Sequence, residues 1–170
     1  RAQFELWVDA VEEYAIFSLD PDGHVISWNQ GAERINGYET SEILGEHIST
    51  FYPEAKAEAG YSDELLLEAL EENSVEDEGW WVRKDGSKFW ADAVITAVRD
   101  EDGTHTGFVN VTRDTTERHK ELEDAKESKA FVDRALEVLD DVFYVLDSDG
   151  NVSRIGDRAI EVTGYQEEEI

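Results

Sequence analysis

Hydrophobic residues near the start of the chain recur at helical spacing. Residues 4–11 carry apolar side chains at i, i+3, i+4 and i+7, which predicts an amphipathic helix. Residues 14–19 and 24–28 then form two short apolar runs, separated by Asp-Pro-Asp-Gly. Pro and Gly at the centre of such a tetrapeptide favour a tight turn. The two runs therefore predict a β-hairpin.

Short helices are expected after this hairpin. Asn29 is a good N-cap residue and Gly37 a good residue for the helix end, because an amide oxygen accepts a free backbone N–H and Gly adopts positive φ. Thr40 or Ser41 is expected to cap the next short helix. Residues 61–72 repeat apolar positions at helical spacing, which predicts a longer helix.

Three strand-like stretches follow, at residues 75–83, 88–99 and 104–112. The separators Lys-Asp-Gly-Ser and Asp-Glu-Asp-Gly are typical of hairpin turns. Together with the first hairpin, the pattern predicts an α+β fold, in which an antiparallel sheet packs one face against the helices.

The chain contains an internal repeat. The motif Leu-Asp-x-Asp-Gly-x-Val begins at Leu19 and again at Leu146, an offset of 127 residues, and a Gly-Tyr pair recurs at the same offset. So long an offset indicates tandem domains rather than a solenoid. We therefore expect one domain over residues 1–118, a helical linker over 119–139, and the start of a second, truncated domain over 140–170.

Composition narrows the class of partner. The chain has 42 acidic and 15 basic residues, a net charge of −27, yet 11% of its residues are aromatic, so it should fold rather than remain disordered. It has no basic cluster, which argues against contact with nucleic acid or with an anionic membrane. No apolar run approaches the ~18 residues of a membrane span, so we expect a cytoplasmic location. This expectation is compatible with attachment of the parent protein to a membrane through another segment.

Three residue counts carry information about the source. The absence of Cys excludes disulfides and thiolate metal sites, and the absence of Met indicates a piece of a longer protein. Few Lys residues beside many acids resemble the cytosolic proteins of extreme halophiles, although an ordinary acidic protein is the alternative.

The order of these elements and their motifs resembles the PAS family of sensor domains. The motifs are Asp20-x-Asp22-Gly23-x-Val25-x-x-x-Asn29, Gly37-Tyr38, Ile43-x-Gly45, Lys84-Asp85-Gly86-Ser87-x-Phe89-Trp90, Gly103-x-x-x-Gly107-Phe108 and Arg113-Asp114-Thr115-Thr116-Glu117-Arg118. Thr115 departs from the apolar residue that the family usually has there. The resemblance implies a five-stranded antiparallel sheet in the order 2-1-5-4-3, with short helices on one face and a linker helix after it. It also implies a sensor module, here expected to come from a haloarchaeal multi-domain sensor histidine kinase or transducer-like regulator.

Alternation along the strands predicts a candidate ligand cavity. Ala91 and Ala93 fall on one face of their strand, which by the resemblance faces the helices, and two small side chains leave space there. The candidate lining residues are Trp81, Ala91, Ala93, Ile95, Phe108, Asn110, Thr112 and Ile48. The alternative is that Trp81 and Phe side chains fill this space, with a water molecule on Asn110.

The resemblance also narrows the classes of cofactor that the domain can bind, while the cofactor itself stays unknown. Flavin photoreceptors of the family need a cysteine at the position that aligns with Ile48, and their flavin-binding Asn positions align with Trp81 and Ala91. Haem-binding members need an axial His within residues 61–72, where none occurs. The sequence thus excludes the flavin adduct and argues against flavin and haem. No metal site is predicted, and we interpret the acidic run Glu76-Asp77-Glu78 as a solvated face rather than a cation site.

The fragment carries no catalytic constellation. His119 is followed by Lys120 and by no Pro, unlike the phosphoacceptor His of sensor kinases, so we interpret it as an ordinary linker residue. We expect enzyme activity in the parent protein and not in this fragment, with the kinase or other output domain elsewhere in the same chain.

Residues 116–139 predict the linker helix, with residues at 3-4 spacing as in a dimer seam, all of them apolar except Lys129. The alternative for the second half of this helix is that it packs against its own sheet. We expect Asp114, Thr116 and Glu117 to pass a ligand- or partner-induced change into this helix, and a homodimer to form through the N-terminal or linker helices. The alternatives are a ligand-free dimerisation module and the sensor part of a transcriptional regulator.

The halophile hypothesis predicts a salt-dependent stability. At about 1 M salt the Debye length is roughly 3 Å, so repulsion among the surplus carboxylates should nearly vanish. We expect the thermal unfolding midpoint to rise by several degrees between low salt and molar KCl, measured by circular dichroism. Equal midpoints would contradict the hypothesis.

Overall fold

The structure is a computed structural model that describes residues 11–138 and 144–164. Two predicted features lie outside the described residues. They are all but the last residue of the helix expected at residues 4–11, and the end of the predicted linker seam at residue 139. The chain divides into two compact units, Arg1–His119 and Lys120–Ile170, which are described separately below.

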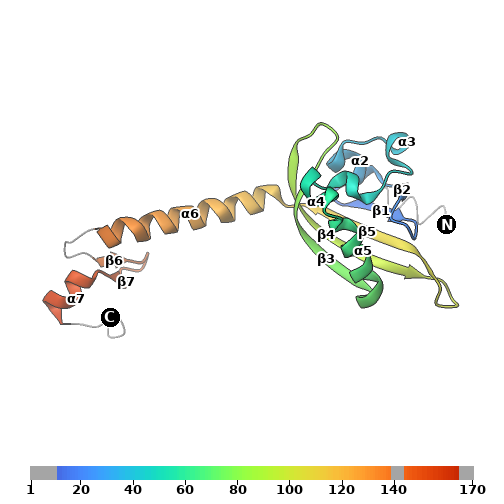
Figure 1. Cartoon of the computed structure of the whole chain (residues 1–170). Coiled ribbons are helices and arrows are strands. Elements are labelled where there is room, and N and C mark those ends of the chain that lie inside the picture. The colour runs from blue at the N-terminus through green and yellow to red at the C-terminus, as the bar shows by residue number, and fades with distance from the viewer. Residues whose placement is uncertain (1–10, 139–143, 165–170) are drawn as a thin grey trace. The chain divides into compact units, whose positions relative to one another are not determined.

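The first unit is built on one five-stranded antiparallel sheet (Figure 1). Its strands are β1 (Ala15–Leu19), β2 (Val25–Trp28), β3 (Ser74–Val82), β4 (Lys88–Arg99) and β5 (His105–Asp114). Their order is β2-β1-β5-β4-β3, which confirms the predicted fold class and topology.

Short helices cover one face of this sheet (Figure 1). They are α2 (Gln30–Asn36), α3 (Thr40–Ile43), the 3-10 helix η1 (Ile48–Phe51), α4 (Glu54–Glu58) and α5 (Tyr61–Glu72). The bounds of α5 agree with the prediction. Neither η1 nor α4 was predicted, because four or five residues are too few to show a helical period.

Asn29 fixes where the first of these helices begins. Its side-chain oxygen accepts hydrogen bonds from the backbone N–H of Ile16 at 2.9 Å and of Ala32 at 2.8 Å. Its side-chain nitrogen donates to the carbonyl of Tyr14 at 3.1 Å. One side chain therefore caps α2 and ties it to β1, as the N-cap prediction requires. Gly37 ends α2 with φ of 80°.

The predicted cap of α3 was wrong. Glu39, rather than Thr40 or Ser41, is the N-cap residue, and its backbone N–H donates to the Glu42 carboxylate at 2.9 Å. The hydroxyl of Thr40 donates to the Glu33 carboxylate at 2.7 Å. The Thr40 side chain thus serves a contact with α2.

The core lies between the sheet and the helices. Along β4, Phe89, Ala91, Ala93 and Ile95 are fully buried while the intervening side chains are at least partly exposed, as the alternation predicts. Phe51 on η1 connects the aromatic side chains of the core, with its ring centroid 5.5 Å from that of Trp28 and 5.4 Å from that of Phe17.

The linker helix α6 runs over Thr116–Val138 and leads from β5 toward the repeated motif. Among the described residues, no helix combines the length and the hydropathy that crossing a bilayer requires.

The second unit repeats the first hairpin in detail. It contains β6 (Tyr144–Leu146), β7 (Val152–Ile155) and α7 (Asp157–Thr163). Leu19 pairs with Val25 in the first unit, and Leu146 pairs with Val152 in the second. Both hairpins have an irregular register at the same step. The 127-residue offset thus holds for strand pairing as well as for sequence.

Gly31 provides a test of how closely α2 approaches β1. A Cβ at Gly31 would lie 2.0 Å from the carbonyl oxygen of Tyr14, so Gly31→Ala must push the helix away from the sheet. We expect a loss of about 1–3 kcal/mol of unfolding free energy, measured by urea denaturation. Gln30→Ala, an exposed neighbour, should change it by less than about 0.5 kcal/mol. Equal effects of the two substitutions would contradict the close approach.

Candidate functional site

The eight candidate cavity residues all lie in the core. Seven come from the inner faces of β3, β4 and β5, and Ile48 comes from η1 across the core. Each of them, namely Trp81, Ala91, Ala93, Ile95, Phe108, Asn110, Thr112 and Ile48, is at most 1% exposed. The structure therefore places them in the layer between the sheet and the helices.

Asn110 is the most polar of these side chains. Its Nδ2 donates to Oγ1 of Thr112 at 2.6 Å, within the core. Its Oδ1 is buried without a hydrogen-bond partner among the residues that the structure describes. Because buried polar atoms are nearly always paired, this oxygen is a free acceptor for a water molecule or a small ligand.

Trp81 occupies much of the space at the β3 end of the candidate site. Its indole stacks on the ring of Phe51, with centroids 5.8 Å apart and planes 9° apart, and lies 5.2 Å from the ring of Tyr52. This packing supports the alternative in which aromatic side chains fill the core beside Ala91.

Asp77 was expected on a solvated acidic face, and this expectation was wrong. The side chain points inward on β3 and is 3% exposed. Its carboxylate accepts hydrogen bonds from the hydroxyls of Tyr52 and Tyr61, both at 2.8 Å, and from Nε1 of Trp81 at 3.2 Å. Burial and the nearby carboxylate raise the pKa of Tyr61 to about 12, so its phenol remains a donor even in alkaline solution.

Asp114 joins the sheet to the linker helix. One carboxylate oxygen accepts a hydrogen bond from Arg83 at 2.6 Å. The other accepts the backbone N–H of Thr116 at 3.0 Å and its hydroxyl at 2.5 Å. Burial raises the pKa of Asp114, but the bonds from Arg83 and Thr116 outweigh it, so the pKa is lowered overall.

Arg83 extends this connection to a helix of the core. Its guanidinium also donates to the carbonyl of Ile35 on α2 and lies 4.3 Å above the ring of Phe89. No local sequence pattern indicates the role of Arg83, because its partner Asp114 lies 31 residues away.

Trp90 holds the beginning of α6 from the neighbouring strand. Its backbone N–H donates to Oγ1 of Thr116 at 2.9 Å, and its carbonyl accepts the N–H of Thr115 at 2.8 Å. The ring of His119 stacks on its indole, with centroids 3.6 Å apart. Glu117 is exposed in the first helical turn, where a negative charge is favourable.

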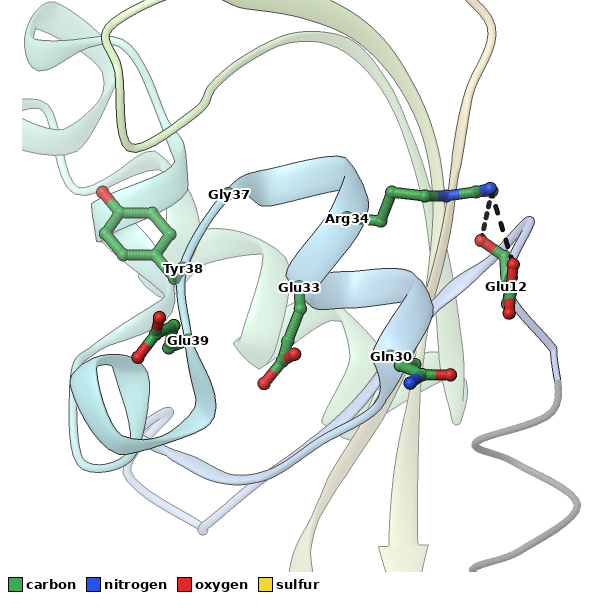
Figure 2. Close-up of a pocket in the computed structure, with 7 residues that line it drawn as sticks. All are labelled: Glu12, Gln30, Glu33, Arg34, Gly37, Tyr38 and Glu39. Carbon is green, nitrogen blue, oxygen red and sulfur yellow. Dashed lines mark hydrogen bonds and ion pairs between the residues drawn. The ribbon is translucent and has the colours of Figure 1, made fainter.

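Two surface pockets lie beside Gly37, away from the candidate cavity residues. One, of about 430 Å³, is shown in Figure 2, where Arg34 pairs with Glu12. The other, of about 460 Å³, includes Arg83 in its wall. None of the eight candidate residues lines either pocket.

Comparison with known proteins decides the family. The sequence profile of a PAS domain matches residues 13–117, more than half of the chain. The chain belongs to the PAS domain family. Two-component system protein A of Emericella nidulans is 48% identical over 120 residues, which are 71% of this chain and 17% of that protein. The bacterioopsin transcriptional activator of Halobacterium salinarum is 28% identical over 120 residues, again 71% of this chain and 18% of that protein.

A solved PAS domain shows the same fold. The crystal structure of a PAS domain from Colwellia psychrerythraea superposes with a TM-score of 0.63 at 23% identity, covering 68% of this chain and 97% of that one. The chain therefore spans nearly all of a solved PAS domain, but less than a fifth of either curated relative.

The lowered pKa of Asp114 predicts a pH-dependent stability. Asp114→Asn should remove about 1.5–3 kcal/mol of unfolding free energy at pH 7, because it leaves the Arg83 charge unpaired. The extra unfolding free energy of the wild type is fully present above the pKa of about 3.9 that an Asp carboxyl has in the unfolded chain. It is lost as pH falls through the lower pKa of Asp114 in the folded protein. The difference between the two proteins should thus shrink between pH 7 and pH 3, measured by urea denaturation.

Asp92→Asn is the matched control for this measurement. Asp92 is exposed on the same sheet, and its substitution should have little effect at either pH. A constant difference between wild type and Asp114→Asn from pH 7 to pH 3 would contradict the charged role of Asp114.

Proposed function

We propose that this PAS domain is a signal-sensing module of a cytoplasmic, multi-domain signalling protein, and that it passes a ligand- or partner-induced change into α6. The relatives named as a two-component system protein and as a transcriptional activator support a signalling role. Because the chain matches less than a fifth of each, the output domain belongs to the rest of the parent protein.

The double contact of Asp114 carries the proposal. A change in the core that moves β3 or α2 reaches Arg83, which directly follows β3 and whose guanidinium donates to Ile35 on α2 and to Asp114. Asp114 then transmits that movement to Thr116, the first residue of α6. The signal therefore has a hydrogen-bonded route from the core to the linker helix.

The free acceptor on Asn110 supports a small polar ligand in the core. A ligand that donates a hydrogen bond to Oδ1 would satisfy an otherwise unpaired buried atom. Asn110 lies on β5, the strand that ends at Asp114, so such a ligand would act directly on the strand that leads to the linker.

A ligand-free dimerisation module is the second candidate. It is favoured by the stacked core rings of Phe51 and Trp81 and by apolar side chains on the linker helix. Leu122 and Val132 on α6, both positions of the predicted seam, are 54% and 48% exposed, and a second copy would cover them in a helical seam.

We place the sensor domain at residues 1–118, the linker at 119–139 and the beginning of a second PAS domain at 140–170. The repeated hairpin supports this division, because its Asp147 accepts the same pair of backbone bonds as Asp20 does in the first unit. A sensor histidine kinase of a halophile is the parent that we favour, with a transcriptional regulator as its rival.

Substitution of Asp114 in the intact parent protein tests the proposed function. Asp114→Ala should uncouple the sensor from the output and change basal or stimulated output at least several-fold at equal protein abundance. Asp92→Ala should leave the output unchanged. Unaltered output of Asp114→Ala, with equal abundance confirmed by immunoblot, would overturn the proposed route.

A further inference from the structure

Gly79 leaves a gap on the inner face of β3. It is buried between the inward-facing side chains of Asp77 and Trp81. A Cβ placed on Gly79 would find one atom within 4 Å outside its chain neighbours, the Nζ of Lys56 at 3.6 Å. The ammonium group of Lys56 therefore lies in the space that a side chain at this position would take.

One aromatic ring contacts the ammonium group, and further aromatic and acidic groups are linked to that ring. The Lys56 ammonium lies 4.0 Å from the ring centroid of Tyr61, a distance typical of a cation–π contact. The ring of Tyr52 lies 5.5 Å from that of Tyr61 and 5.2 Å from that of Trp81. Asp77, two residues from Gly79 on the same face, holds the hydroxyls of both tyrosines.

This combination suits one chemical class of ligand. Ring faces and a carboxylate attract an ammonium ion, and a site with little water strengthens both attractions. Lys56 forms no ion pair among the described residues, although the chain carries a net charge of −27. Its ammonium is instead directed at the tyrosine ring.

Lys56 is also weakly held in place. It belongs to α4, a helix of five residues none of which is buried. Withdrawal of its side chain into solvent would break the contact with Tyr61 without uncovering a core side chain of α4. A free ligand can therefore compete with Lys56 for the gap.

We propose that the gap above Gly79 is a binding site for small organic ammonium ions, and that Lys56 is its tethered occupant, which such a ligand displaces. Binding of such an ion to this site does not depend on the presence of an output domain. Only its consequence, a change at η1 and α5 that alters the core, rests on the proposed sensory function.

Isothermal titration calorimetry of the 170-residue chain tests the proposal, with tetramethylammonium and methylammonium chloride as probes at constant total chloride. Lys56→Ala should bind at least one probe at least tenfold more tightly than wild type, because the tethered competitor is gone. Lys88→Ala removes an exposed cation from the same sheet and should bind as wild type does.

A second substitution ties the effect to the gap. Lys56→Ala combined with Gly79→Ala should lose the added affinity, since the new methyl group fills the space, while circular dichroism confirms that the variant is folded. Equal affinity of Lys56→Ala and Lys88→Ala, or tight binding that persists in the double variant, would overturn the inference. If binding fails while Asp114→Ala still changes the output of the parent, the sensory function stands and the ammonium site is wrong.

Discussion

The carboxylate of Asp114 connects the sheet, one helix of the core and the linker helix through a single group of hydrogen bonds. Its two oxygens serve different partners, Arg83 at the end of β3 and Thr116 at the beginning of α6. A half-buried charge is stable only while its partners remain in place. Because Arg83 also donates to the last turn of α2, three elements far apart in the sequence meet at one electrostatic contact.

Local signals predicted much of the fold. The strand Lys88–Arg99 has the predicted bounds, since twelve residues of alternating character define a period without ambiguity. Asn29 and Gly37 act at the two ends of α2 as expected, because capping is a property of single residues and their immediate neighbours. The resemblance to PAS domains then supplied the strand order, which no local pattern contains.

The parts that could not be predicted depend on distant partners. Asp77 was interpreted as part of a solvated acidic run, yet alternation along β3 turns it inward while Glu76 and Glu78 stay exposed. Tyr52 and Tyr61 make that burial tolerable, and neither can be recognised as a partner from sequence spacing. The candidate cavity is limited in the same way, because side-chain conformations such as the stacking of Trp81 on Phe51 decide how much space remains beside Ala91.

The continuity of α6 has a mechanical consequence. Its 23 residues, at 1.5 Å per residue, make a rod about 34 Å long. A tilt of about 5° at its first residue would displace the far end by about 3 Å if the rod stays stiff. A rotation of a few degrees at Thr116 thus corresponds to a displacement of about 3 Å at the other end of a stiff helix.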